Sequence, residues 1–303
     1  MHTVEARGGR YHIVNGEGVS VKDYGHKHTA TSKLEAFNTV ADPTEQLLTS
    51  PAARYPINKR FEFTSALVQM VVDGITPSAI VTGDGGLGKS HTVLESLYAS
   101  DMEDISLLEM EEGDEIECKN ADGSFRYYNI VKGFSTAKGL YEMLYDNRHN
   151  LIIFDDCDSI QKDANAINLL KGALDSYDKR TISWQKSAGF GDDYPRTFQF
   201  EGGVIFISNM TQERLDQALR TRAMCVDLSM TVAQKIDRIE FVSKERKFLP
   251  DYTAEVKAES VELIREHMTD ANELSIRSLI NVCKIAKNGN ADWKDLATYM
   301  LTN

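Results

Sequence analysis

The most informative segment of the chain reads Gly83-Asp84-Gly85-Gly86-Leu87-Gly88-Lys89-Ser90. It follows a short β-branched stretch, residues 78–83, and precedes SHTVLESLYAS, which has helical periodicity. Between a strand and a helix, the pattern G-x-x-x-x-G-K-[ST] predicts a phosphate-binding loop. Glycines let backbone N–H groups converge on phosphate, Lys89 reaches the β- and γ-phosphates, and Ser90 offers a hydroxyl to Mg²⁺. We assign nucleotide binding to this whole segment and to His91 after it.

A second segment supplies carboxylates. LIIFDD at residues 151–156 is a continuous apolar run that ends in two aspartates, as expected of a parallel strand buried on both faces. We expect Asp155 to lie near Mg²⁺ and Asp156 to polarise the attacking water, with Asp158 as the nearby alternative. The simpler interpretation is that these acidic residues only end a strand and take no part in catalysis.

The flanking sequence alternates strand-like and helix-like stretches up to about residue 230. This alternation predicts an α/β fold, a parallel sheet wrapped by helices. Only helical periodicity follows, which predicts a small all-helical domain. We expect an N-terminal arm or irregular extension at residues 1–50, a core at 51–230 and the helical domain at 231–303. The acidic stretch at 101–125 reads as a solvated surface insertion.

Composition narrows the class of protein. The 303 residues are 42% hydrophobic and 26% charged, which excludes wholesale disorder and fibrous repeats. The formal charge of −12 argues against a surface that coats nucleic acid or anionic membrane, although a local basic channel is compatible with it. Four scattered cysteines indicate neither a zinc site nor a disulfide framework, and no apolar run is long enough to span a membrane. We expect a cytoplasmic protein without a membrane partner.

Taken in order, these motifs resemble the AAA+ ATPase superfamily over residues 55–300. The resemblance implies ATP and Mg²⁺ as cofactors, an AAA+ core with helices on both faces of the sheet, and a helical lid. It implies that Asn209, at the end of FISN, orients the hydrolytic water. LDQALRTR at 215–222 is similar to the segment that sends an arginine into a neighbouring subunit's site, with Arg222 the first choice and Arg220 the second. ELSIRSL at 273–279 is similar to the lid helix that contacts nucleotide through an arginine, here Arg277. Most members carry Glu where this chain has Asp156, so hydrolysis is expected to be slower or that role shared.

Two segments are candidates for contacting a substrate in the pore of such a ring. One contains Lys138 beside Gly139, without the aromatic residue of protein-threading relatives. The other, residues 180–203, reads as two short strands around a glycine-rich turn, where a large branch of the superfamily, including superfamily-three viral helicases, inserts a hairpin. Its Trp184, Lys186, Phe190 and Arg196 offer stacking surface and positive charge. Equally, Trp184 and Phe198 could pack on the core.

The resemblance extends to AAA+ proteins of bacteriophages and mobile elements. We therefore expect a homo-oligomeric ring, most simply a hexamer, that couples ATP hydrolysis to remodelling of, or translocation on, nucleic acid in replication or recombination, as a helicase or helicase loader does. The alternatives are ATP-driven remodelling of a protein partner, and a slow nucleotide-dependent switch or scaffold.

Overall fold

The computed structural model describes residues 3–7, 10–14, 20–24, 54–108, 117–133, 136–177, 179–184 and 194–303. The chain divides into two compact units, residues 1–54 and residues 55–303. None of the helices in the described ranges is long and apolar enough to cross a membrane.

The first unit contains a three-stranded antiparallel sheet, so our expectation of an irregular extension is wrong for this part. Its strands are β1 (Thr3–Arg7), β2 (Arg10–Val14) and β3 (Ser20–Tyr24), in the order β1-β2-β3. Arg7 is paired with Arg10, so only two residues, both glycines, connect β1 to β2. A Gly-Gly dipeptide between two short strands is a hairpin signal that the weak periodicity of this segment obscured.

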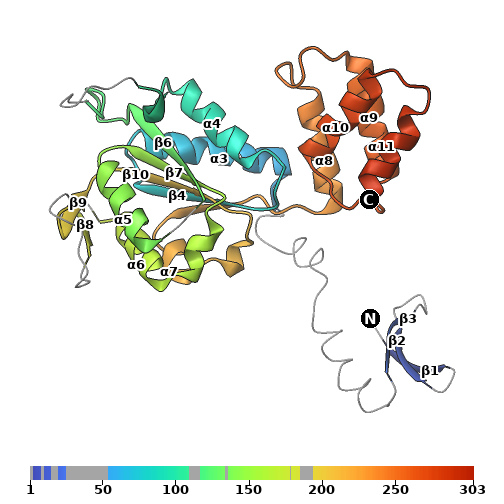
Figure 1. The fold of residues 1–303 in the computed structure, drawn as a ribbon, viewed down its shortest axis with the longest axis horizontal. Coiled ribbons are helices and arrows are strands. Elements are labelled where there is room, and N and C mark those ends of the chain that lie inside the picture. The colour runs from blue at the N-terminus through green and yellow to red at the C-terminus, as the bar shows by residue number, and fades with distance from the viewer. Residues whose placement is uncertain are drawn as a thin grey trace. The chain divides into compact units, whose positions relative to one another are not determined.

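The second unit is built on a six-stranded parallel sheet (Figure 1). The order across it is β11-β4-β10-β7-β6-β5. The strands are β4 (Ser78–Thr82), β5 (Glu103–Asp104), β6 (Tyr127–Lys132), β7 (Leu151–Asp155), β10 (Gly203–Ile207) and β11 (Met224–Asp227). The edge strand β5 comes from the acidic stretch that we expected to be a surface insertion; two of its residues pair with β6, and residues 109–116 lie outside the described ranges.

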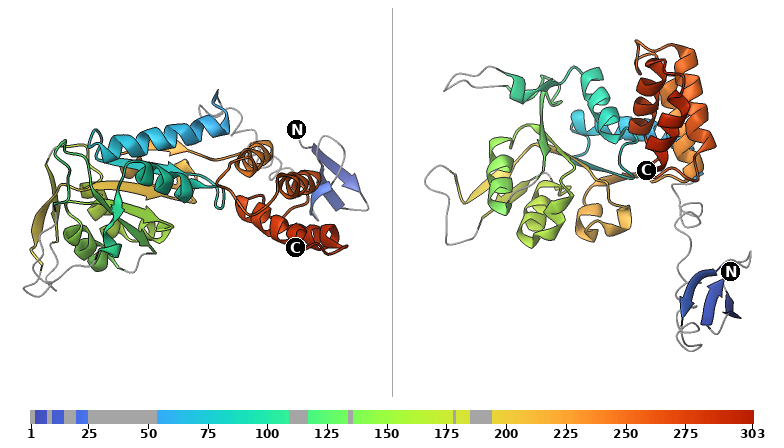
Figure 2. Two further views of the ribbon diagram at one scale, coloured as in Figure 1. Left: turned by 90° about the horizontal axis from the view of Figure 1, so that it is seen from above. Right: turned by 45° about the vertical axis from the view of Figure 1, so that its right-hand side comes forward.

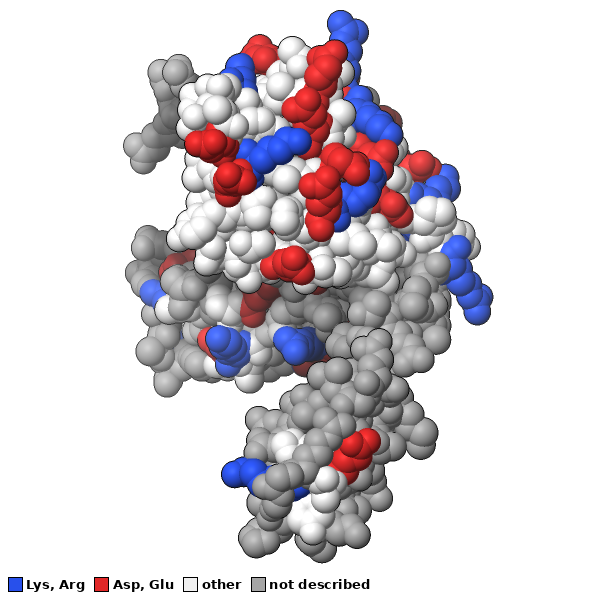
Figure 3. Space-filling model, turned by 90° about the vertical axis from the view of Figure 1, so that its right-hand side faces the viewer, with Lys and Arg blue, Asp and Glu red and all other residues white. Residues whose placement is uncertain are grey.

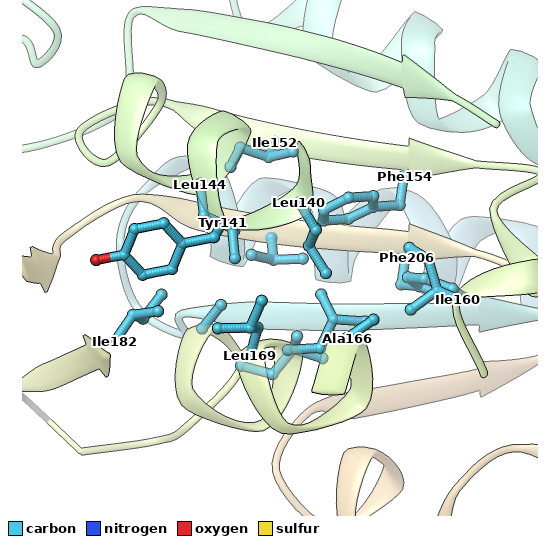
Figure 4. Close-up of a cluster of buried hydrophobic side chains, with 14 of the residues drawn as sticks. Leu140, Tyr141, Leu144, Ile152, Phe154, Ile160, Ala166, Leu169, Ile182 and Phe206 are labelled. Atoms are coloured by element: carbon cyan, nitrogen blue, oxygen red, sulfur yellow. The ribbon is translucent and has the colours of Figure 1, made fainter. Parts of the chain in front are cut away.

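Helices cover both faces of this sheet (Figures 1 and 2). One face packs against α3 (Ile57–Val72) and α4 (Lys89–Ala99). The other packs against α5 (Ala137–Asp146), α6 (Ala164–Ala173) and the short α7 (Gln217–Arg220). Successive strand side chains alternate between the two cores: Ala79 and Val81 join the first, whereas Ile80 joins the second. Figure 4 shows the second core, where Ile152, Phe154 and Phe206 of the sheet meet Leu140, Tyr141 and Leu169 of the helices.

Four helices follow the sheet, which we call the lid: α8 (Val232–Ser243), α9 (Ala254–Glu266), α10 (Ile276–Lys287) and α11 (Trp293–Thr302). The lid has a hydrophobic cluster of its own, which includes Ile239, Ile264 and Leu279. Thr231 and Gln234 form a capping box that starts α8, and the Ser275 hydroxyl accepts from the N–H of Ser278 to start α10. The fold class is therefore α/β, a parallel sheet covered by helices on both faces and followed by a helical domain, as the sequence predicted.

The sheet order brings together the polar residues that end its strands. β10 lies between β4 and β7, and Ile207 is in register with both Val81 and Asp155. The loop after β4, the aspartates after β7 and Asn209 after β10 consequently meet at the carboxyl edge of the sheet, where ligands of open α/β sheets bind.

Candidate nucleotide-binding site

The loop after β4 has a backbone that requires glycine. Gly83 has φ 135°, and a Cβ there would lie 2.6 Å from the carbonyl carbon of Leu228. Gly88, with φ 99°, occupies the N-cap of α4 in the left-handed region, where no side chain caps the helix in the described structure. The N–H groups of the first turn of α4 are therefore left to bind an anion, as the predicted phosphate-binding loop requires.

Lys89 lies across this loop and is almost fully buried. Its ammonium donates to the carbonyl oxygens of Gly83 (2.8 Å) and Asp84 (2.7 Å) and to Oδ1 of Asn209 (2.8 Å). Burial lowers the pKa of Lys89 below its usual value, and the surrounding aspartates, Asp156 foremost, counteract that shift. Phosphate oxygens are stronger acceptors for an ammonium than these neutral carbonyls are.

Ser90 and Asp155 form a pair suited to a hard cation. The Ser90 hydroxyl donates to Asp155 Oδ1 at 2.7 Å, and Asp155 is buried at the end of β7. Mg²⁺ beside a nucleotide needs only one or two protein oxygen ligands, because phosphates and water complete its coordination. Within the described ranges no three or more His, Cys, Asp and Glu side chains are grouped so that they could hold a metal ion by themselves. The residues present thus fit a nucleotide-bound Mg²⁺.

Asn209 connects the phosphate loop to the second aspartate. Its Nδ2 donates to Asp156 Oδ1 at 2.5 Å while its Oδ1 accepts from Lys89. Asp156 is exposed and has φ 57°, a left-handed conformation that Asp adopts more readily than most residues. The structure thus places Asn209 and Asp156 in contact at the edge of the loop, with Gly85 beside the amide.

Asp158 has a different function in the structure. Its Oδ1 accepts from the Ser208 hydroxyl at 2.6 Å and its Oδ2 accepts from the Asn209 N–H at 3.2 Å. Both oxygens therefore hold the end of β10 in place. Asp156, not Asp158, is the aspartate that lines the adjoining cavity.

A cavity of about 450 Å³ opens between the loop and the lid. One end is polar, formed by Gly85, Lys89, Ser90, His91, Asp156 and Asn209. The lid contributes an apolar wall, made of Val242, Phe248, Leu249, Ile276 and Ile280. An apolar wall with a few polar groups is the usual setting for a purine base. Our sequence analysis missed these five residues, because helical periodicity shows that they are apolar but not that their side of the lid faces the loop.

The lid contacts the phosphate loop directly. Ile276 N–H donates to the Gly86 carbonyl at 2.8 Å, and Lys235 pairs with Asp84 at 2.7 Å. Arg277, the second residue of α10, is exposed and lines the cavity, where the resemblance placed it. Arg238 of α8 also lines the cavity, is only 5% exposed, and was not identified from the sequence. Burial lowers its pKa to about 10.

The two arginines predicted to act on a neighbouring subunit lie elsewhere. Arg222 pairs with Asp175 at 3.3 Å and donates to the Ala218 carbonyl at 2.9 Å. Arg220 is partly buried, and its Nε has no hydrogen-bond partner in the described part of the chain. Neither is among the residues that line the cavity of its own chain.

The segment predicted to form a hairpin contains two antiparallel strands, β8 (Arg180–Ser183) and β9 (Thr197–Phe200), and residues 185–193 between them lie outside the described ranges. Trp184 does not present its ring for stacking, however, because it is 9% exposed and packs against Tyr141 with 5.8 Å between ring centroids. The alternative of core packing is thus the one the structure shows for Trp184 and for Phe198, which also contacts Tyr141. The predicted substrate residues Lys186 and Phe190 lie outside the described residues.

Lys138, the other substrate candidate, lies in the first turn of α5. Its side chain is about half exposed and pairs with Glu142 at 3.5 Å. Phe134, the nearest aromatic residue before it in the chain, lies outside the described ranges.

Comparison with known proteins finds distant relatives. No known protein-family model matches the chain. It is 25% identical over 262 residues, 80% of its length, to 73% of an uncharacterized 36.7 kDa protein of the nrdC-mobD intergenic region of Enterobacteria phage T4. Among solved structures it is similar to NtrX from Brucella abortus in complex with ATP, with a TM-score of 0.45 and 11% identity over 88% of this chain. The chain spans 55% of the length of that structure.

Proposed function

We propose that this chain is a Mg²⁺-dependent ATPase of the AAA+ type. The observation that carries the proposal is the position of Asn209, whose amide joins the phosphate-loop Lys89 to Asp156. A chain that only bound nucleotide would need no polar network at the γ-phosphate end of the loop. Here an ammonium, an amide and a carboxylate converge where a hydrolytic water would attack.

The roles follow from the contacts. Lys89 exchanges its carbonyl partners for β- and γ-phosphate oxygens. Ser90 and Asp155 would hold Mg²⁺, which supplies positive charge against the phosphates. Asn209 positions the water, and Asp156 accepts its proton. The apolar wall of the lid holds the base.

We further propose that the active form is a ring, hexameric in the simplest case, in which Arg222 or Arg220 completes the neighbouring subunit's site. Two observations support this. Arg220 is the last residue of α7 and Arg222 follows it, and neither lines the cavity of its own chain. Arg222 is held by the partly exposed carboxylate of Asp175 and by the Ala218 carbonyl, contacts that it can leave at small cost.

For the substrate we propose nucleic acid, contacted through the hairpin. Acidic and basic side chains are interspersed on the face of the lid seen in Figure 3. Glu240 of the lid, for example, pairs with both Lys244 and Arg265. The lid surface seen in that view therefore does not offer an extended basic patch. The hairpin carries Arg196 on its exposed side and Lys186 in its sequence. The similarity to a phage T4 protein supports a phage origin for this chain, and we propose a role in replication or recombination.

Steady-state ATP hydrolysis, measured over a range of protein concentrations with and without single-stranded DNA, tests these proposals. The rate per subunit should rise with concentration and fall at least about tenfold in Arg222→Ala or Arg220→Ala. Arg214→Ala is the matched control, an exposed arginine just before α7 that should retain the rate. Stimulation by DNA should disappear in Lys186→Ala. Hydrolysis that ignores DNA would redirect the search to a protein partner, and negligible turnover despite ATP-dependent assembly would indicate a switch.

A further inference from the structure

Arg238 is a buried cation at the junction of lid and core. It belongs to α8, is 5% exposed, and stacks its guanidinium 3.7 Å above the ring of Phe61. Its Nη1 donates to Oδ1 of Asn58 at 3.1 Å. Asn58 and Phe61 both belong to α3, so the arginine joins the first lid helix to the first core helix.

The remaining edge of the guanidinium has no protein partner. Nε is buried without a hydrogen bond among the described residues, and Nη2 makes none that the described structure contains. The charge of Glu245 raises the pKa of Arg238, but the two side chains do not form an ion pair in the described structure. A buried guanidinium with an empty donor edge is costly, since removing a charge from water is compensated only by partners.

The other two buried arginines of the described structure use both of their terminal nitrogens. Arg60 also has a buried Nε without a partner among the described residues, but its Nη1 donates to the Asp227 and Ser229 carbonyls and its Nη2 donates to Gln234 Oε1. Arg180, whose pKa burial likewise lowers to about 10, donates from Nη1 to the Ala173 carbonyl and from Nη2 to the Gly202 carbonyl. Its two terminal nitrogens are thus both used within the protein. Arg180 holds the hairpin to the core, whereas Arg238 leaves one edge unused.

Nη2, the terminal nitrogen on that edge, faces the nucleotide cavity. Arg238 lines the cavity, and a Cβ built on Gly88 would lie 3.5 Å from Nη2. Lys235, Arg238 and Val242 are spaced three and four residues apart on α8, so they share one helix face. Lys235 pairs with Asp84, and Val242 lines the apolar wall, so this face of α8 runs along the phosphate loop.

The position along the loop identifies which part of the nucleotide is nearest. Gly85 lies beside Asn209, at the end where γ-phosphate is hydrolysed. Gly88 lies beside Arg238 and Ile276, at the start of α4 and next to the apolar wall. An acceptor placed there is a phosphate on the base side of the nucleotide, and it is present in both ATP and ADP.

We propose that Arg238 is a nucleotide-binding residue, whose Nη2 donates to the α-phosphate. This inference rests on the proposed function. Nη2 belongs to a permanently charged guanidinium, so its hydrogen bond to a phosphate oxygen is charge-assisted. Arg238 thereby reports the presence of any nucleotide to α8, while Asn209 and Asp156 respond to the γ-phosphate alone.

Calorimetric titration with ADP and with a non-hydrolysable ATP analogue tests this on the full chain. Arg238→Met keeps the stem that packs on Phe61 and removes every donor. Its Kd should rise about 10- to 100-fold, equally for both nucleotides. Arg238→Lys, which keeps the charge without the planar guanidinium, should lose less. Arg180→Met is the matched control, a buried arginine away from the cavity whose loss should leave both Kd values within about twofold.

Thermal unfolding without nucleotide separates binding from a structural role. Arg238→Met should unfold at the wild-type temperature or above it, because an unpaired buried charge is removed, whereas Arg180→Met should unfold at a lower temperature. Unchanged affinity in Arg238→Met, or a loss confined to the ATP analogue, would overturn the inference. Failure of the wild type to bind either nucleotide would instead overturn the proposed function.

Discussion

The hydroxyl of Ser90 donates to Asp155 Oδ1 at 2.7 Å, which joins the first turn of α4 to the end of β7. The two residues are 65 positions apart in the chain. They meet because only β10 lies between β4, which leads into the loop before Ser90, and β7, which ends at Asp155. A hydroxyl and a buried carboxylate at this distance form a ligand pair that one small cation can bridge.

Ser90→Ala should uncouple nucleotide binding from magnesium. We expect ATP hydrolysis to fall by about 10² or more, because one ligand of the charge-stabilising metal is lost. ADP affinity in the presence of EDTA should stay within about twofold, because the N–H groups of the loop remain. Titration of ADP with and without Mg²⁺ measures both effects. Ser96→Ala is the control, since Ser96 only donates to the Thr92 carbonyl on the same helix. An unchanged Mg²⁺ dependence in Ser90→Ala would contradict the assignment.

Asp156→Asn should separate chemistry from binding. We expect kcat to fall by about 10²–10⁴, the usual contribution of a general base, while the Kd for ADP changes little. Asp156→Glu retains a carboxylate and should keep more of the rate than the amide does. Single-turnover hydrolysis and ADP titration give the two readouts.

Asp158→Asn distinguishes the neighbouring carboxylate from Asp156. Asp158 holds Ser208 and the Asn209 backbone, so its loss should lower the unfolding temperature. The rate should fall less than in Asp156→Asn. A larger loss of kcat in Asp158→Asn would assign the base to Asp158 instead.

The features that could be predicted from the sequence are those formed by contiguous residues. The phosphate loop and the aspartates after β7 are contiguous motifs, and each motif needs only a strand beside it to be interpretable. Asn209 required more, because an Asn after a strand is usually a turn residue. Its importance comes from the sheet order, which places β10 between β4 and β7.

The unpredicted part depends on contacts between distant segments. Arg238 bonds to Asn58 across 180 residues, and nothing in the sequence of α8 marks that arginine among its charged neighbours. The apolar wall of the cavity is similar: the lid helices carry several apolar residues, and only packing determines which of them face the nucleotide. Trp184 was predicted as a substrate contact but is buried. The sequence could not decide between the two, because an aromatic residue beside a glycine-rich turn suits stacking and burial equally well.

Trp184→Ala should destabilise the protein rather than impair a substrate contact. Its indole is buried against Tyr141, and truncation of such a side chain costs about 3 kcal/mol of unfolding free energy. Urea unfolding followed by circular dichroism measures this change. Tyr177→Ala provides the comparison, since Tyr177 is 75% exposed and should unfold like the wild type. A fully stable Trp184→Ala protein would mean that the ring is free for a ligand.

Ionisation of the Cys157 thiol should lower the free energy of unfolding at alkaline pH. The thiol is fully buried between β7 and the following turn, and it donates to the carbonyls of Val131 and Gly133. Burial raises the pKa of Cys157 to about 11, so the folded chain keeps a proton that the unfolded chain has already lost. The stability that this neutral thiol contributes is complete below the pKa of the unfolded state and is lost as pH rises toward 11, about 2 kcal/mol in all.

Cys157→Ser isolates this effect, because serine keeps a donor for the two carbonyls but does not titrate. The unfolding free energy of the wild type should decrease relative to that of Cys157→Ser between pH 9 and pH 11. Urea unfolding at half-unit pH steps gives the difference between the two proteins, in which the titration of lysines and tyrosines common to both cancels. A difference that stays constant over this range would show that the Cys157 thiol ionises as readily in the folded chain as in the unfolded one.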